Sequence, residues 1–385
     1  MAKRIKEILF IILLLTFPLG EIARIQFSNG AAVTATDIAV ILFVLVSILG
    51  GKFSKPKLLK PLAIFVSVAM ISLLINFTNL KSVELLISAL YLLRWTAYTG
   101  IYLSMVNFDT SFKKKVPAML SVVGGVIVVG GIAQYFLYPN LRNLYYLGWD
   151  EHLYRLFSSF LDPNFAGAFL VLYLLFVLGI FMRTKNSIYG FLSTLAIFGI
   201  VLTFSRSAYL MLFAGLFTFL LLYGKKKLIL AVSLLFLASI ASIFILGRGS
   251  EGTNLLRTTS TQARVPSAQN ALTIFEKNPI LGVGFNAYEF ASKRYGLSKT
   301  SKFPNHAAAG TDNSFLFVLA TIGAVGFLSY LYLWFKIISA PRKNSYSTVL
   351  ISSSIALFVD SLFINSLFYT FIMLWMWILI ALVED

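Results

Sequence analysis

Long apolar runs follow one another along the chain, separated by short polar interruptions. A bilayer core of about 30 Å needs about 20 apolar residues per helix, and shorter runs can span when flanking residues reach the interface. The pattern predicts twelve transmembrane helices, over residues 7–20, 37–50, 61–77, 83–105, 116–138, 164–182, 187–203, 207–223, 228–246, 313–337, 347–364 and 366–382. We therefore expect an all-α, polytopic bundle that forms one integral membrane domain over residues 1–385.

Basic residues gather in six clusters at alternate ends of these runs. Since lysine and arginine mark cytoplasmic loops, all six clusters would lie in the cytoplasm together with both termini. The formal net charge of +17 is then mostly a consequence of topology and does not indicate nucleic acid as a partner. The clusters are Lys3/Arg4/Lys6, Lys52/Lys55/Lys57/Lys60, Lys113/Lys114/Lys115, Arg183/Lys185, Lys225/Lys226/Lys227 and Lys336/Arg342/Lys343.

The amino-acid composition excludes several classes of protein and of active site. With 58% hydrophobic and 12% charged residues, the chain is not a water-soluble globule. It has no cysteine, which removes disulfides, thiolate nucleophiles and cysteine-ligated metals, and its two histidines argue against a histidine-rich metal site. We expect neither a metal ion nor another cofactor.

Two segments on the predicted outer side are too long to be simple connections. They are residues 139–163 and 247–312, and the second is a large extracytoplasmic loop between the ninth and tenth predicted spans. Within it, "AQNALTIFEKNP" has helical apolar spacing and could lie along the membrane interface, whereas Gly282-Val283-Gly284 indicates a turn. Loops of this length in a compact protein usually carry function.

Arg206 interrupts an otherwise apolar stretch, "LTFSRSAYL", at the predicted outer junction of two spans. An arginine left in hydrocarbon costs at least about 2.5–3.5 kcal/mol, so it needs an interface or a partner. One interpretation is that it reaches lipid headgroups. The other is an anion site, because the N–H groups and dipole at the start of the next helix add to the guanidinium.

The large loop ends in "FPNHAAAGTDNSFLF", where Asp312 directly precedes the span predicted over 313–337. Asp312 could cap that helix, or its carboxylate could serve as a general base at the outer rim. His306 is the other group nearby that titrates near neutrality, although a loop histidine is commonly just solvated.

Other charged residues also fall at positions that suggest a role. Arg155 precedes Asp162-Pro163-Asn164, which has the signature of a helix N-terminus. Arg94 and Asp360 lie inside predicted spans, where a charge is either functional or paired with a structural partner.

Taken together, these motifs resemble the O-antigen ligase and O-antigen polymerase superfamily of bacterial envelope glycan assembly. The resemblance covers roughly residues 150–340 and is carried by the segment from Arg155 to Asn164, by "LTFSRSAYL", by "QARVPSAQNALTIFEKNPILGVGFNAYEF", and by "DNSFLFVLATIGAVGF". The family typically has His-Asn where this chain has Asp312-Asn313. That departure is more compatible with a polymerase than with a ligase.

The resemblance implies a glycosyltransferase of the bacterial inner membrane that moves a glycan from undecaprenyl diphosphate to an acceptor hydroxyl on the outer face. Arg206 and Arg264 match the family's diphosphate-binding positions, and Asp312 matches the position of its histidine. We predict that Asp312, rather than His306, activates the acceptor, and that Arg155, Arg94 and Asn313 are candidate substrate contacts. The expected partners are the lipid-linked oligosaccharide, an acceptor glycan or glycolipid, and membrane lipids.

Three functions are compatible with this pattern. We favour a metal-independent polymerase that joins repeat units, with a ligase that transfers the glycan to a lipid A-core acceptor of lipopolysaccharide as the alternative. A lipid-linked oligosaccharide flippase or another transporter would also be basic and polytopic, but it should show inverted repeats and charges near the membrane midplane. The distinctive polar groups of this chain concentrate on one face, which favours surface chemistry.

Overall fold

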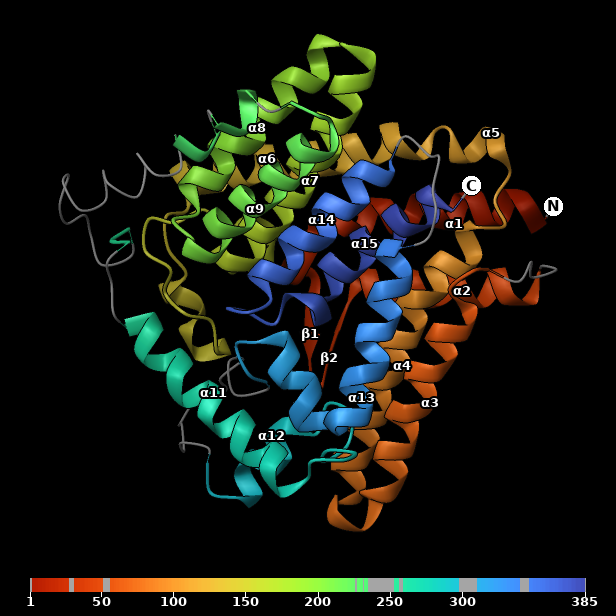
Figure 1. Ribbon diagram of the computed structural model, residues 1–385, viewed down its shortest axis with the longest axis vertical. Helices are drawn as coiled ribbons and strands as arrows, with labels where there is room; N and C mark the ends of the chain where they lie inside the picture. Colours follow the sequence, from red (N-terminus) through yellow and green to blue (C-terminus); the bar gives the residue numbers. More distant parts are fainter. Residues whose placement is uncertain are drawn as a thin grey trace.

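Helices make up most of the computed structural model, which describes residues 2–27, 31–50, 56–225, 227–230, 232–234, 253–255, 259–297, 310–339 and 346–384 (Figure 1). The all-α prediction is confirmed. The α-helices are α1 (Ala2–Thr16), α2 (Ala35–Leu49), α3 (Leu59–Ile75), α4 (Ser82–Met105), α5 (Thr110–Lys113), α6 (Val116–Leu137), α7 (Pro163–Thr184), α8 (Ser187–Leu202), α9 (Arg206–Leu222), α11 (Thr259–Lys277), α12 (Tyr288–Arg294), α13 (Ser314–Ser339), α14 (Ser347–Asp360) and α15 (Thr370–Val383).

Short 3-10 turns and one small β-ribbon connect the helices. The turns are η1 (Phe17–Ala23), η2 (Phe77–Asn79), η3 (Arg142–Leu147), η4 (Ser158–Phe160) and η6 (Ser366–Phe368). Strand β1 (Arg24–Gln26) pairs antiparallel with β2 (Ala32–Thr34), with Ile25 opposite Val33. This ribbon links α1 to α2.

The helix boundaries follow the predicted apolar runs closely, but they do not settle the number of spans. Within the described residues, three helical stretches are long and apolar enough to cross a membrane, namely Thr110–Leu137, Pro163–Thr184 and Ser314–Ser339. Several other apolar helices are shorter, such as α9 and α15. Most of the span predicted over 228–246 lies outside the described residues.

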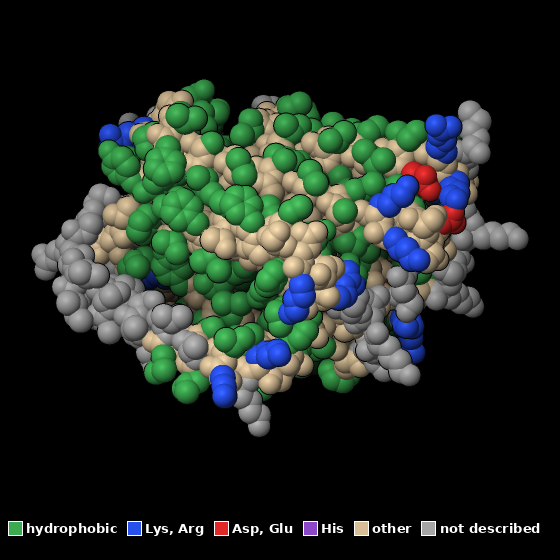
Figure 2. Space-filling model, turned by 90° about the horizontal axis from the view of Figure 1, so that it is seen from above, with side chains coloured by type: hydrophobic (Ala, Val, Ile, Leu, Met, Phe, Trp, Pro, Cys, Tyr) green, Lys and Arg blue, Asp and Glu red, His purple; other side chains and the backbone are tan. Residues whose placement is uncertain are grey.

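Apolar side chains fill the centre of the protein and also cover much of its surface. Every residue of α7 from Ala166 to Val177 is buried, and so is every residue of α15. Many large apolar side chains on the outer helices are exposed, including Leu45 of α2 and Phe191 of α8. Figure 2 shows one face covered largely by hydrophobic side chains, with basic side chains mainly at the right end and along the lower edge. Such a surface suits a membrane-embedded protein.

The span predicted over 313–337 is not one continuous helix. α13 is interrupted at Gly323, whose φ is 68°, and the "NPILGVG" segment of the large loop lies against the break. There, the N–H of Ala324 donates to Pro279 O at 2.8 Å and the N–H of Gly284 donates to Thr321 O at 2.9 Å. A side chain on Gly323 would meet the backbone of Ile280, so only glycine allows this approach.

α3 holds the same segment from the other side. The hydroxyl of Ser72 donates to Leu281 O at 2.5 Å, and the amide of Asn76 donates to Gly282 O at 3.0 Å. Part of the large loop is therefore inserted between helices. This anchoring ties the segment that follows α11 to α3 and to the middle of α13.

Candidate functional site

A cavity of about 400 Å³ brings together the start of α9, the middle of α11, the start of α13 and the turn after α14. The predicted residues Arg206, Arg264, Asp312 and Asn313 all line it. The remaining lining residues are Ser207, Leu210, Val265, Ala268, Thr311, Leu362 and Phe363. The cavity thus combines two cations and one carboxyl group with an apolar wall.

Arg206 is held at the cavity by a tight turn between α8 and α9. Phe204 takes a φ of 46°, and Ser205 caps α9 by accepting a hydrogen bond from the N–H of Ala208. The Ser205 hydroxyl also donates to Asn164 Oδ1 at 2.8 Å, which ties the turn to α7. Arg206 is therefore the first residue of a capped helix, at the end where the helix dipole favours an anion.

The guanidinium of Arg155 donates hydrogen bonds to this turn. Arg155 is buried, and its Nε donates to Thr203 O at 2.9 Å while its Nη2 lies 3.4 Å from Phe204 O and from Asn164 Oδ1. These contacts satisfy carbonyl groups at the end of α8. Arg155, which the sequence suggested as a substrate contact, holds the turn that carries Arg206 and does not itself line the cavity.

Arg264 reaches the cavity from α11. Its guanidinium lies 5.9 Å from the centre of the Phe363 ring, a cation–π distance. The positive charge of Arg264 also repels the positive charge of Arg206, whose side chain is partly buried. Because two like charges facing one cavity repel each other, a bound anion would relieve the repulsion.

Asp312 lies beside these arginines at the start of α13. Its N–H donates to Ser267 Oγ at 3.2 Å, and none of the described residues donates a hydrogen bond to its carboxylate. Burial raises the pKa of Asp312 above its ordinary value, Arg264 opposes this shift, and the carboxylates of Asp162 and Asp150 add to it. Burial prevails, so this group is a stronger base than an exposed aspartate.

Asn313, and not Asp312, caps α13. Its Oδ1 accepts hydrogen bonds from the N–H groups of Phe315 and Leu316 at 2.9 and 3.0 Å. The interpretation of Asp312 as the helix cap is therefore wrong, because its neighbour fills that position. The carboxylate of Asp312 is left to face the cavity.

Two further candidate residues do not line this cavity. Arg94 is paired with Asp37, with Nη2 and Oδ2 3.1 Å apart, and also donates to Ala32 O, so it is not part of the cavity wall. Asp360 is fully buried at the end of α14, where it accepts a hydrogen bond from Ser366. His306 lies outside the described residues.

Two further groups, Ser267 and His152, were not singled out from the sequence. Ser267 donates to Thr311 Oγ1 at 3.1 Å and accepts from the N–H of Asp312, which joins α11 to the start of α13. Its position three residues after Arg264 on one helix face was the available signal. His152 Nε2 lies 4.0 Å from Oδ2 of Asp162, the residue that caps α7. No local sequence pattern predicted this pair.

Part of the chain that forms this cavity is similar to a known protein family. Residues 191–331 match the family model described as O-antigen ligase. The matched stretch runs from α8 into α13 and includes Arg206, Arg264, Asp312 and Asn313. No curated protein matches the chain.

Proposed function

We propose that this chain, whose residues 191–331 match the family model described as O-antigen ligase, belongs to the O-antigen ligase and polymerase superfamily and is a glycan polymerase. It would transfer a lipid-diphosphate-linked oligosaccharide to an acceptor sugar hydroxyl at the outer face of the membrane. The observation that carries the proposal is the meeting of Arg206, Arg264 and Asp312 around one cavity. A membrane protein of this family acts in envelope polysaccharide assembly, so the lipid-linked glycan and its acceptor are its expected partners.

The three side chains divide the chemistry between them. A glycosyl diphosphate is already activated, so the protein needs to hold the anionic leaving group and to place a nucleophile. Arg206 and Arg264 would bind the diphosphate through charge-assisted hydrogen bonds and stabilise the charge that develops on it. Asp312 would accept the proton of the acceptor hydroxyl as its oxygen bonds to the anomeric carbon and the carbon–diphosphate bond breaks. Attack opposite the leaving group would invert the anomeric centre, and no metal ion is required.

The proposed site faces the periplasm or cell exterior, in a bacterial inner membrane with both termini in the cytoplasm. This orientation is supported by the six basic clusters, which would all be cytoplasmic. Because the chain has no cysteine, single cysteines at Lys114 and Glu276 can be labelled separately in intact cells. We expect an impermeant thiol reagent added outside to label Glu276→Cys and not Lys114→Cys. Equal labelling of both would overturn the orientation.

A ligase is the second candidate, because the matching family model is described as O-antigen ligase. The two activities differ in product. We expect the purified protein, given lipid-linked oligosaccharide, to produce a ladder of lengthened glycans on the lipid. A single transfer to a lipid A-core acceptor, without a ladder, would indicate a ligase. Movement of the intact lipid-linked oligosaccharide across a vesicle membrane, without either product, would indicate a flippase.

A further inference from the structure

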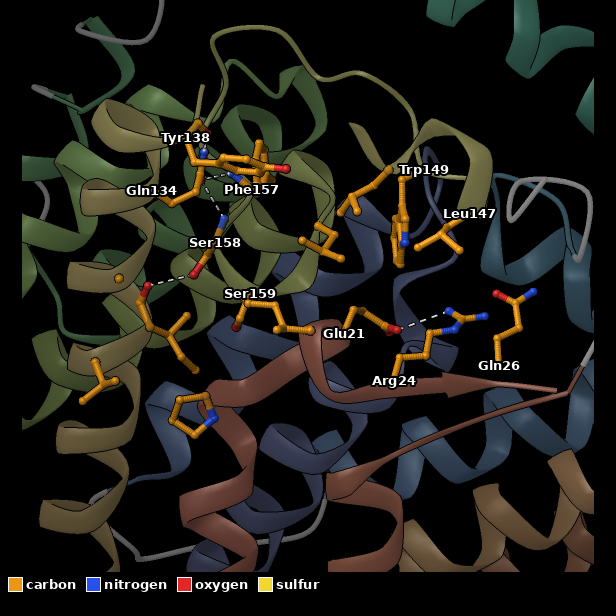
Figure 3. Close-up of a pocket in the computed structure, with 17 residues that line it drawn as sticks. Glu21, Arg24, Gln26, Gln134, Tyr138, Leu147, Trp149, Phe157, Ser158 and Ser159 are labelled. Carbon is orange, nitrogen blue, oxygen red and sulfur yellow. Dashed lines mark hydrogen bonds and ion pairs between the residues drawn. The ribbon is translucent and has the colours of Figure 1, made fainter. Parts of the chain in front are cut away.

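We propose that a second cavity, which the family match does not assign, binds a glycolipid with an uncharged, hydroxyl-rich head. The cavity has a volume of about 690 Å³ and lies between η1, β1, α6 and the segment that follows α6 (Figure 3). Its polar lining residues are Glu21, Arg24, Gln26, Gln134, Tyr138, Trp149, Ser158 and Ser159, and its apolar ones include Pro18, Ile22, Val126, Ile127 and Leu147. Binding at this cavity is independent of the proposed transfer reaction.

The side chains that line the cavity change from apolar to polar along α6. Val126, Gly130 and Gln134 follow at intervals of four residues, so they lie on one face of the helix over about 12 Å. Val126 and Ile22 are more than half exposed, which places the apolar part at the surface that would face lipid. The polar part lies toward the end of α6 at Leu137, the predicted outer end. A lipid whose chain lies beside Val126 and whose head reaches Gln134 fits this gradient.

Gly130 keeps the middle of the cavity open. A Cβ atom placed on it would have no neighbour within 4 Å, although most glycines of this bundle are packed against other side chains. The lining also includes Ser158 and Leu161, which have φ values of 51° and 55°. Non-glycine residues rarely take this left-handed conformation, and such strain is often found at ligand sites.

The polar end of the cavity carries no net charge. Arg24 Nη1 and Glu21 Oε2 are 3.2 Å apart, and the side chain of Glu21 is only 7% exposed. The Arg24 guanidinium also lies 5.8 Å from the centre of the Trp149 ring (Figure 3). Sugar hydroxyls both donate and accept hydrogen bonds, so they suit a lining that presents a carboxylate and a guanidinium side by side. Trp149 adds an aromatic face with an apolar surface.

This electrostatic balance distinguishes the second cavity from the first. Arg206 and Arg264 face one carboxyl group and favour an anion such as diphosphate. In contrast, a phosphate head placed beside Arg24 would also meet the carboxylate of Glu21, which opposes it. An uncharged head that both donates and accepts hydrogen bonds avoids this conflict. Phosphate-headed lipid is therefore the competing occupant in the test.

The test uses two photoreactive probes with the same dodecyl chain, one carrying a maltose head and the other a phosphocholine head. The full-length protein, purified without glycoside detergent, is placed in nanodiscs of phosphatidylethanolamine and phosphatidylglycerol. Crosslinked peptides are then mapped by mass spectrometry. We expect saturable labelling of α6 and η1 by the maltoside, at a concentration at least tenfold lower than that needed for the phosphocholine probe. Equal or stronger labelling by the phosphocholine probe would overturn the proposal.

Two variants locate the binding. Gly130→Leu places an apolar side chain in the cavity, its Cβ atom meets nothing within 4 Å, and leucine improves helix propensity, so the fold should be retained. We expect it to reduce maltoside labelling at least tenfold, whereas Ala133→Leu, exposed on the same helix but outside the cavity, should leave it unchanged. Glu21→Gln should weaken labelling several-fold. Full labelling of Gly130→Leu would contradict the site, whatever the outcome of the ladder assay, because no lipid diphosphate is present.

Discussion

Replacing Asp312 by asparagine is expected to lower glycan transfer by about 100-fold to 10,000-fold, the usual contribution of a general base. Asparagine has nearly the same shape but cannot accept the proton of the acceptor hydroxyl. The fold should persist, because Asn313 rather than Asp312 caps α13 and Asp312 contacts Ser267 through its backbone. Turnover of lipid-linked oligosaccharide by the purified variant is the measurement, with binding of the lipid diphosphate expected to be unchanged.

The pH profile gives an independent check on the same carboxylate. A base acts in its deprotonated form, so transfer should be lost as pH falls through the pKa of Asp312. Since burial raises that pKa, the loss should begin at a higher pH than for an exposed aspartate. Glu276→Gln, at an exposed carboxylate outside the cavity, is the matched control and should be nearly fully active. Normal turnover of Asp312→Asn together with an inactive His306→Ala would assign the base to the histidine instead.

Exchanging Arg206 or Arg264 for lysine is expected to weaken transfer about tenfold to a hundredfold although the charge is kept. A lysine ammonium cannot form the paired, planar hydrogen bonds that a guanidinium makes with phosphate oxygens. At Arg206 the loss should appear in both donor affinity and turnover, because the same contacts bind the ground state and stabilise the departing diphosphate. Steady-state kinetics and direct binding of a non-hydrolysable lipid diphosphate would separate the two effects.

Arg294→Lys is the matched control for these exchanges. Arg294 lies in the last turn of α12 and does not line the cavity. It should keep near wild-type activity. If the Arg206 and Arg264 variants behaved like this control, both arginines would be interfacial residues without a role in binding the donor.

Local sequence was sufficient to predict most helices and the charged residues of the first cavity. Apolar runs determine where helices form in a membrane, because every backbone polar group must be bonded within the segment itself. Arg206 and Arg264 were also readable, the first from the interruption of an apolar run and the second from its place in a motif of the large loop. Their convergence with Asp312 was expected, and the structure brings the three together. Their roles in binding and catalysis remain predictions.

Which partner each polar residue finds was decided only by the tertiary structure. Arg94 and Arg155 have the same side chain as Arg206, yet one pairs with Asp37 from α2 and the other bonds the carbonyl groups that end α8. The break in α13 at Gly323 depends on a loop segment that lies some forty residues earlier in the sequence. The second cavity likewise joins η1 to α6, more than a hundred residues apart. Apolar periodicity depends on residues that are neighbours in the sequence. The partner of a charged side chain, and the backbone that packs against a glycine, are set by what the folded chain places beside them.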